Sequence, residues 1–362
     1  MIIDLDSHLR EEYFLDEVYR LPEPYQDYTP KRIGDGRYQH ARFEHRLYPW
    51  GQEVGRHFDH SLVYDPDANW RGGEVARRQQ GGWDMEFRLR DADREGIDLQ
   101  LLFPTRIQLP TTYPGPMGVA LCQQYNNWVR ELIRGHEDRL LPVALMPAGH
   151  PEAMADELKR AVRELGFRAA HLVPYVGERN LDDPIFDPFY ATAQELGVPL
   201  FCHPNSEGHL INRFDNFFAM HVLGRPLNCT AALVALVTGG VFERFPNLNV
   251  VFFECSAEWI LYWMHRMDDD YKNMQYGFAP KISAAPSEYI RRNCYVTCEA
   301  DERHLGRAVE EIGADHVLMA TDYPHFDSEF PETVSGIRAR GDIDEETKAK
   351  ILGENARRLL RL

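Results

Sequence analysis

Basic residues are in short supply in this chain. It has 40 Lys and Arg against 57 Asp and Glu, which gives a formal net charge of −17. A surface of this sign repels nucleic acid and anionic membranes, so neither is an expected partner. An anionic small molecule is not excluded, because a bound cation can reverse the field inside one pocket.

Cysteine is scarce too, and long apolar runs are missing. The six cysteines form no CxxC pair and most stand within apolar segments, which is typical of reduced thiols rather than of a disulfide framework. No run approaches the roughly 20 apolar residues that cross a bilayer. The first residues enter an apolar segment with no basic leader before it. We therefore expect a cytoplasmic protein without a membrane span.

The chain does contain eight short apolar segments that indicate β-strands. Most are continuous rather than alternating, as in parallel strands that helices cover. Stretches with helical periodicity lie between them, for example PEAMADELKRAVRELG and DERHLGRAVEEIG. The expected strands are 2–6, 97–104, 141–147, 169–174, 199–203, 250–255, 294–299 and 317–322.

This alternation of strand and helix predicts an α/β fold, a (β/α)8 TIM barrel, as one domain over 1–362. A doubly wound sheet is the weaker alternative, because no glycine-rich phosphate loop follows the first strand. The segment 10–93 is too long for a simple connection and is rich in Tyr, Arg, His and Pro. It predicts an insertion after strand one that lies as a lid over the barrel mouth. The segment 205–226 is a second candidate lid.

Acidic and histidine residues follow several of the expected strands. Asp6 and His8 end the first strand, His203 the fifth, Glu254 the sixth and Asp322 the eighth. In a TIM barrel the carboxyl ends of all strands meet at the face that holds the active site. Charged groups there are costly to bury unless something pairs with them, and a metal ion is the usual partner. These residues are therefore candidate metal ligands.

Each candidate also has a plain structural interpretation. Asp6 and Asp322 would cap turns, His8 would lie at the surface and His203 would be a hydrogen-bonded core residue. Glu254 would form a salt bridge with Arg266 or another barrel arginine. Only convergence of all these side chains at one rim would favour the metal site.

Further candidates lie close to the strand ends. The sequence does not tell whether His171, on the fourth strand, points into the barrel or outward under a helix. His325 follows the eighth strand, where it would either exchange a proton beside a metal ion or close the loop. Weaker candidates for lining a pocket are His221, for which a packing role is equally plausible, Arg225, and the aromatic residues Tyr175, Trp259 and Tyr323, since aromatic residues at such places more often pack in the core.

Taken together, the motifs resemble the amidohydrolase superfamily, in particular the amidohydrolase-2 branch that includes aminocarboxymuconate-semialdehyde decarboxylase. The similarity covers nearly the whole chain and is carried by IIDLDSH, FRAAHLVP, LDDPIFDPFYATAQELGVPLFCHP, GGVFERFPNLNVVFFECSAEWILYWMHRMD, LMATDYPHFDSEFP and KILGENARRLL. The resemblance implies a divalent metal ion held by an acidic-x-His or His-x-His pair on strand one, a His on strand five and an Asp on strand eight. These positions are Asp6, His8, His203 and Asp322.

The chain departs from this pattern at the end of strand six. Decarboxylases of the family carry a catalytic His there, and this chain has Glu254. His171 falls near the place where dinuclear members of the superfamily have a bridging lysine. With Glu254 and His171 added, the donors suffice for one or two ions. A mixed oxygen and nitrogen set suits iron or manganese at least as well as zinc.

Three functions stay open. The first is a hydrolase or lyase, in which the metal ion activates water and polarises a carbonyl while Asp322, Glu254 or His325 moves the proton. The second is a dinuclear non-haem iron monooxygenase with Glu254 and His171 as extra ligands. The third is a metal-free binding protein on a degenerate barrel. The expected partner is a small organic molecule, aromatic or carboxylated, and the resemblance adds a homodimer, since members of this family often form dimers.

Overall fold

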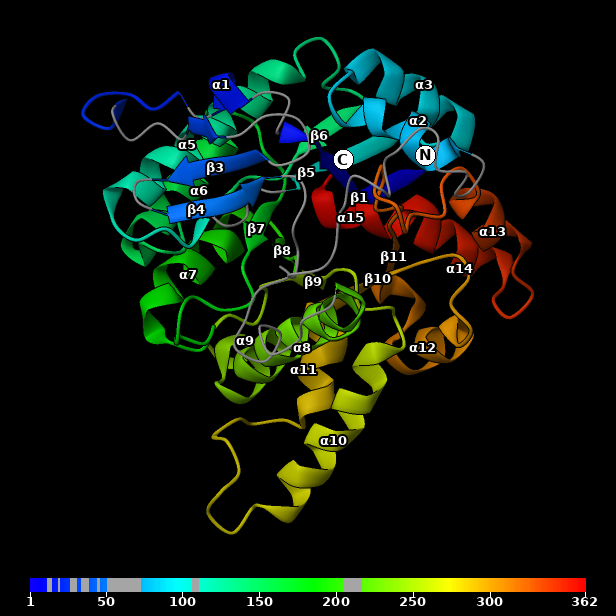
Figure 1. The fold of residues 1–362 in the computed structure, drawn as a ribbon. Coiled ribbons are helices and arrows are strands. Elements are labelled where there is room, and N and C mark those ends of the chain that lie inside the picture. The colour runs from blue at the N-terminus through cyan, green and yellow to red at the C-terminus, as the bar shows by residue number, and fades with distance from the viewer. Residues whose placement is uncertain are drawn as a thin grey trace.

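The computed structural model describes residues 1–11, 15–18, 20–26, 31–33, 39–43, 46–50, 73–105, 111–204 and 217–362. Within them, eight short strands follow one another around a ring in sequence order, and helices cover the outside of the ring (Figure 1). The ring strands are β1 (Ile3–Leu9), β5 (Leu99–Pro104), β6 (Leu140–Pro142), β7 (Ala170–Leu172), β8 (Leu200–Cys202), β9 (Val250–Phe252), β10 (Cys294–Cys298) and β11 (Val317–Met319).

The strands pair in two parallel sheets, β1-β5-β6 and β7-β8-β9-β10-β11. Isolated parallel bridges join the sheets at both seams. Ala144, just past β6, pairs with Ala170 of β7, and Ser7 of β1 pairs with Tyr323 beyond β11. The expected TIM barrel is therefore confirmed.

Most of the helices alternate with these strands and cover them. Gly96 and Gly197, which follow α3 and α7, have φ of 81° and 65°, the left-handed conformation that glycine adopts most easily. The helices are α1 (Leu15–Val18), α2 (Glu74–Arg78), α3 (Met85–Glu95), α5 (Pro116–Leu132), α6 (Met154–Arg163), α7 (Asp187–Leu196), α8 (Phe217–Thr238), α9 (Val241–Arg244), α10 (Trp259–Asn273), α11 (Pro286–Asn293), α12 (Leu305–Ile312), α13 (Thr333–Ala339), α14 (Glu345–Ala349) and α15 (Asn355–Leu360).

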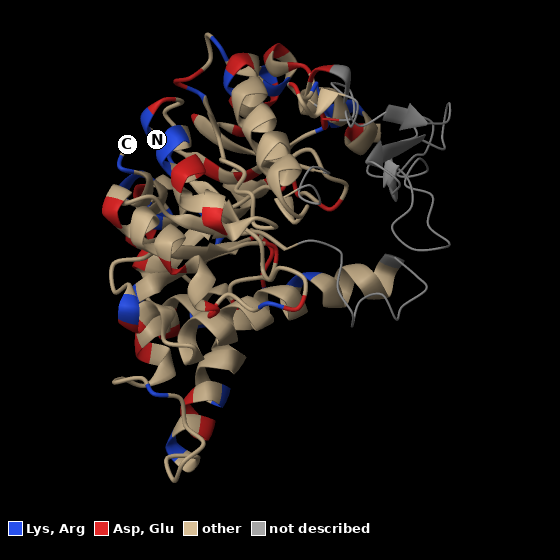
Figure 2. Cartoon of the chain, turned by 90° about the vertical axis from the view of Figure 1, so that its left-hand side faces the viewer, with Lys and Arg blue, Asp and Glu red and all other residues tan. Residues whose placement is uncertain are grey.

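The core has two layers. Ile3 and Leu5 of β1 belong to the apolar cluster inside the ring, whereas Leu9 belongs to the layer between strands and helices. Helix α15 closes the amino end of the barrel, because its Leu359 and Leu360 join the inner cluster. Both chain ends lie together there (Figures 1 and 2). The carboxyl ends of the strands therefore form the open end.

The long segment after β1 is described in part. It contains the antiparallel sheet of β2 (Lys31–Ile33), β3 (Gln39–Phe43) and β4 (Arg46–Trp50), then α2, a 3-10 turn over Gln79–Gly82, and α3. Since α3 connects β1 to β5, the end of the expected insertion is the helix of the first βα unit. Residues 51–72 lie outside the described residues, and the lid role of 10–93 stays a prediction.

The second candidate lid, 205–226, is also described only in part. Residues 205–216 lie outside the described residues, and the remainder forms the first turns of α8. By length and composition alone, the Phe218–Thr238 part of this helix is apolar enough to cross a membrane. Half of its most apolar stretch (50%) is buried inside the fold, as in a core helix of a soluble protein, so this is weak evidence for a span. Figure 2 shows basic and acidic residues interspersed over the outer helices.

Candidate metal centre

Six side chains meet where four of the strands end, and we call them the strand-end cluster: Asp6 and His8 from β1, His203 after β8, Glu254 after β9, and Asp322 and His325 after β11. The register of β1 against β5 shifts between Asp4 and Ser7. A bulge of this kind re-aims side chains beside active sites. Side chains of a regular strand alternate between two faces, so with Leu5 facing the interior Asp6 and His8 would face outward. The register shift explains how both nevertheless reach the cluster.

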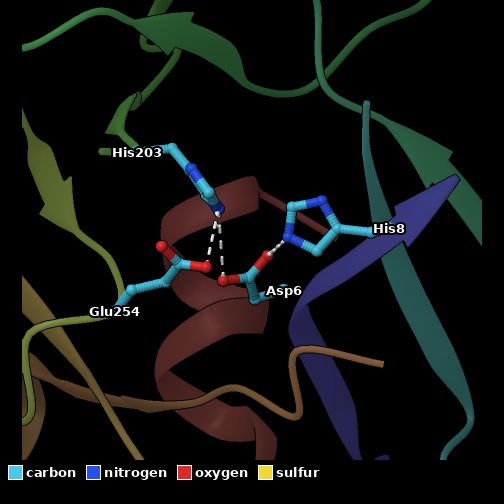
Figure 3. A group of neighbouring side chains, drawn as sticks. All are labelled: Asp6, His8, His203 and Glu254. Atoms are coloured by element: carbon cyan, nitrogen blue, oxygen red, sulfur yellow. Dashed lines mark ion pairs between the residues drawn. The ribbon is translucent and has the colours of Figure 1, made fainter. Parts of the chain in front are cut away.

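The donor atoms of the cluster converge. His8 Nε2 lies 3.1 Å from Asp6 Oδ1 and 3.2 Å from Asp322 Oδ1. His203 Nε2 lies 3.6 Å from Asp6 Oδ2 and 3.7 Å from Glu254 Oε1. Figure 3 shows Asp6, His8, His203 and Glu254 turned toward one another from the ends of β1, β8 and β9. The sequence therefore identified residues that the fold brings together.

Two atoms of the cluster test whether the site suits a cation. Asp6 Oδ1 and His8 Nε2 are buried, and among the described residues neither has a hydrogen-bond partner, although they lie 3.1 Å apart. Leaving such atoms without a hydrogen bond costs about 1–3 kcal/mol each. Carboxylate oxygen and imidazole nitrogen are ligands for manganese, iron or zinc. The residues present therefore fit a divalent metal ion.

The charges of the cluster are strongly coupled. Burial alone would raise the pKa of Asp6, but His203 and His8 outweigh burial and lower it. Burial disfavours the charged form of His8, yet Asp6 and Asp322 hold the pKa of His8 well above its usual value. Protonated imidazole thus balances the carboxylates. A divalent cation would take over that role, because ligating histidines give up their protons.

The cluster contains two overlapping sets of four donors, and within each set all ligand atoms lie within 4.8 Å of one another. His8 and Glu254 belong to both sets, which are completed by Asp6 and His203 in one and by Asp322 and His325 in the other. His8 Nδ1 faces Pro104 O at 3.4 Å, so Nε2 alone points into the cluster and can hold one ion. Both ring nitrogens of His325 are already engaged by protein groups and are not available to a metal ion. Nδ1 donates to Asp322 Oδ1 at 2.7 Å, and Nε2 contacts Thr105 Oγ1 at 3.1 Å. The geometry fits one ion, with His325 orienting Asp322 from outside.

The backbone at two strand ends is strained. Glu254 and Asp322 have φ of 56° and 54°, in the left-handed region that residues with a Cβ rarely adopt. Such conformations cost about 1–3 kcal/mol each and occur where the fold holds a side chain for function. Both residues carry carboxylates of the cluster, so the strain lies where the chemistry is expected.

His171 lies on β7 and points into the barrel. Its ring centroid is 6.5 Å from those of His203 and Phe103. The side chain is buried, and among the described residues neither ring nitrogen has a hydrogen-bond partner. Burial lowers the pKa of His171 to about 3, so the ring is neutral. It stands outside both sets of donors.

Glu254 is paired with Arg225 of α8. Arg225 Nε donates to Glu254 Oε2 at 2.6 Å and its Nη1 lies 3.3 Å from Asp327 Oδ2. His221 Nε2 approaches the same Asp327 oxygen at 3.0 Å. With Oε2 held by the arginine, Oε1 is the oxygen that faces His203. The weaker candidates Arg225 and His221 thus border the cluster.

Asp4 was not among the residues predicted from the sequence. Its Oδ1 accepts from the backbone N–H of Thr321 at 3.0 Å, and its Oδ2 accepts from Thr321 Oγ1 at 2.7 Å and from Gln100 Nε2 at 2.9 Å. Burial raises the pKa of Asp4 to about 7. This carboxyl ties β1 to the segment that carries Asp322. A charged residue inside the apolar run IIDLD was the signal for it.

Two other candidates lie away from the cluster. The Tyr323 hydroxyl donates to Asp91 Oδ2 at 2.8 Å and its ring packs against Phe330. Trp259 Nε1 donates to Thr230 Oγ1 at 3.0 Å. Both side chains therefore stabilise the helical layer.

Comparison with known proteins identifies relatives along most of the chain. The model of a protein family described as "Amidohydrolase" matches residues 39–362. The chain is 27% identical over 285 residues to 2-amino-3-carboxymuconate-6-semialdehyde decarboxylase of Dictyostelium discoideum, which covers 77% of each chain. It is 27% identical over 326 residues to gamma-resorcylate decarboxylase of a Rhizobium species, which covers 83% of this chain and 93% of the relative.

A solved structure supports the fold. The dihydroxybenzoic acid decarboxylase of Polaromonas, with bound manganese and the inhibitor 2-nitroresorcinol, matches 100% of this chain and 97% of its own with a TM-score of 0.72. The sequence identity is 22%, so the likeness concerns the fold. None of these three proteins is named an oxygenase, and the monooxygenase hypothesis gains no support from them.

Proposed function

Because the chain belongs to the amidohydrolase family, we propose that it is a metal-dependent decarboxylase of a small aromatic carboxylic acid. One observation carries the proposal. The Asp322 carboxylate stands beside the converging donors and contacts two imidazoles, His8 Nε2 at 3.2 Å and His325 Nδ1 at 2.7 Å. The two relatives named above are decarboxylases, so they act on carboxylates and release carbon dioxide, as their names state.

We assign the metal ion to Asp6, His8, His203 and Asp322, the positions that the family resemblance implies, with Glu254, which belongs to both sets of converging donors, adjacent. Manganese is the first choice, since it is bound in the solved Polaromonas decarboxylase. When bound, the ion would supply a positive charge that attracts a substrate carboxylate or phenolate oxygen. This local charge is needed in a chain with a net charge of −17, whose surface alone would repel an anion.

Asp322 would move the proton. Burial tends to raise the pKa of Asp322, but His325 and His8 lower it well below its usual value, so the carboxylate is ionised and is able to accept a proton. It would take the proton of a substrate hydroxyl and return it to the ring carbon that bears the carboxylate. The bond from that carbon to the carboxylate then breaks, carbon dioxide leaves, and the bonding electrons restore the aromatic ring.

His325 would act as a positioning residue for this transfer. Its Nδ1–H holds Asp322 Oδ1 at 2.7 Å, and Thr105 fixes its other nitrogen at 3.1 Å. A hydrogen bond of this kind fixes the direction of the carboxylate and favours its ionised form. The proton acceptor is thereby aimed before substrate arrives.

A hydrolase is the second candidate, because Glu254 replaces the strand-six histidine that the resemblance leads us to expect in a decarboxylase. Glu254 Oε1 lies 3.7 Å from His203 Nε2, close enough to the candidate metal position to take a proton from water. The two reactions differ in substrate. An ester, lactone or amide would be cleaved by a hydrolase, and a hydroxybenzoate would be decarboxylated.

The test is a substrate panel on manganese-loaded protein. Hydroxybenzoates, including 2,6-dihydroxybenzoate, should lose carbon dioxide, and in deuterated water the product should carry deuterium at the carbon that bore the carboxylate. Asp322→Asn should reduce kcat by about 10³-fold or more, because no carboxylate is left to move the proton. Cleavage of esters or amides with no decarboxylation would favour the hydrolase. Tight binding without turnover in either panel would favour the binding protein.

The expected homodimer and the cytoplasmic location stay predictions. Light scattering of the purified protein would measure the first.

A further inference from the structure

Arg78, the last residue of α2, is fully buried, with 0% of its surface exposed. Its guanidinium donates to three backbone carbonyls beyond β11. Nε donates to Pro324 O at 3.2 Å, Nη1 to Phe330 O at 3.1 Å, and Nη2 to His325 O. One side chain therefore holds both ends of the loop that follows Asp322.

The residue after Arg78 strengthens this attachment. Gln79 Nε2 also donates to Pro324 O, and its Oε1 accepts from Arg10, just past the end of β1. The backbone N–H of Arg10 donates to Gly82 O at 2.7 Å. The segment Arg78–Gly82 thus connects the ends of β1 and β11, the two strands that bring Asp6, His8 and Asp322 to the cluster.

The fit of this segment is close. A Cβ on Gly81 would lie 1.9 Å from the Tyr323 hydroxyl oxygen, and a Cβ on Gly82 would lie 2.2 Å from Arg10 Cγ. A side chain at either place would have to displace the side chain of Tyr323 or of Arg10. The segment Arg78–Gly82 therefore packs closely against residues that follow β11 and β1.

We propose that Arg78 is a positioning residue for the metal centre: it fixes the loop backbone so that His325 stays between Asp322 and Thr105. The loop reaches the cluster through His325, whose ring stacks on His8 with 4.1 Å between centroids. A planar guanidinium has several donors in a fixed fork, so it can hold three carbonyls at once. Lysine, with a compact ammonium on a flexible chain, cannot reproduce that fork.

The inference rests on the proposed metal site, and its test uses readouts other than turnover. Arg78→Met and Arg78→Lys are compared with wild type for Mn²⁺ affinity by calorimetry and for backbone hydrogen exchange of a peptide covering 321–331. Leu158→Ala is the matched control. Leu158 is 0% exposed in α6, and its truncation destabilises the fold without touching the cluster.

Arg78→Met should weaken Mn²⁺ binding by up to about tenfold and should speed exchange selectively in 321–331, since it loosens His325, the outer partner of a metal ligand, and loss of such a partner costs about 10–100-fold. Arg78→Lys should show the same changes to a smaller extent, and it carries the test if Arg78→Met does not fold. Leu158→Ala should lower thermal stability and leave Mn²⁺ affinity unchanged.

The result that overturns the proposal is an Arg78 variant with wild-type Mn²⁺ affinity and wild-type exchange in 321–331, whatever its stability. A wild-type protein that binds Mn²⁺ and shows these responses but decarboxylates nothing would contradict the proposed function and leave the role of Arg78 standing. Wild-type protein that binds no Mn²⁺ would contradict both.

Discussion

The imidazole rings of His8 and His325 are stacked, with 4.1 Å between their centroids and 24° between their planes. His8 Nε2 and His325 Nδ1 both approach the same oxygen of Asp322, at 3.2 Å and 2.7 Å. A metal-ligand candidate and a loop residue thus act on one carboxylate atom. Asp322 is confined from two sides, which is the arrangement a residue needs if it is to take a proton and return it to a defined carbon.

Removal of the metal ion should destabilise the protein. A ligand that binds only the folded state stabilises it by about 2.7 kcal/mol when present at 100 times its Kd. Chelation should therefore lower the melting temperature, and Mn²⁺ should restore it. Asp6→Asn should weaken Mn²⁺ binding tenfold or more, because one charged, buried ligand is lost. Asp156→Asn is the control, since that side chain is 85% exposed on α6. Equal Mn²⁺ affinity in the Asp6 and Asp156 variants would contradict the assignment.

The metal content should be one ion per chain, and His171 should not change it. The His171 ring is neutral, buried and outside both donor sets. His171→Phe removes the ring nitrogens that a second ion would need and keeps an aromatic ring in the pocket. We expect one Mn²⁺ per chain in both proteins, with affinities within a factor of two. Two metal ions in wild type and one in the variant would restore the dinuclear site that the sequence suggested.

The barrel and its polar strand ends could be predicted from the sequence because both depend on local patterns. The limits of β1 could not. Its apolar run stops at Asp6, but pairing of Ser7, His8 and Leu9 with β5 extends the strand to Leu9. Such pairing is fixed by a partner about 95 residues away. At β11 the reverse holds: the strand ends at Met319, before Asp322 is reached, and the backbone of Asp322 is left-handed rather than extended.

The partner of Glu254 shows a second limit. The sequence left the partner open between Arg266 and another barrel arginine, and Arg266 forms an ion pair with Asp270 on its own helix at 3.0 Å. Arg225, from the preceding βα unit, reaches Glu254 instead. The fold brings Arg225 and Glu254 together at neighbouring strand ends. Sequence periodicity does not predict the distance between two such residues. The orientation of His171 was undetermined for the same reason, because it depends on the register of β7 in the ring.

The Arg225–Glu254 pair should behave as one unit. Arg225 is 17% exposed and Glu254 9%, so removal of one partner leaves a charge largely cut off from water. Losing one member of a buried pair costs about 3–5 kcal/mol. Arg225→Met and Glu254→Gln should each lower the free energy of unfolding, and the double variant should lose less than the sum of the two single losses. Urea unfolding of the four proteins gives a coupling free energy, which we expect at about 1–3 kcal/mol. Additive losses would mean that each residue acts through other contacts.

Stability should depend on pH through Glu95 at the end of α3. This side chain is 7% exposed; its Oε1 accepts from Val334 N at 2.7 Å, and among the described residues Oε2 has no hydrogen-bond partner. Burial raises the pKa of Glu95 from 4.5 to about 7. Between these values the folded protein keeps a proton that the unfolded chain has released, so stability falls as the pH rises through this window.

Glu95→Gln should remove this dependence, because the amide keeps the accepting oxygen and never ionises. We expect the variant to gain on the order of 1 kcal/mol over wild type at pH 8 and little or nothing at pH 4.5, where both proteins are neutral at this position. The measurement is the difference in unfolding free energy between variant and wild type at each pH. Glu178→Gln, at an exposed position beyond β7, is the control and should show no gain at either pH. A Glu95→Gln protein that is less stable than wild type at pH 8 would mean that the ionised carboxylate has a partner that stabilises it.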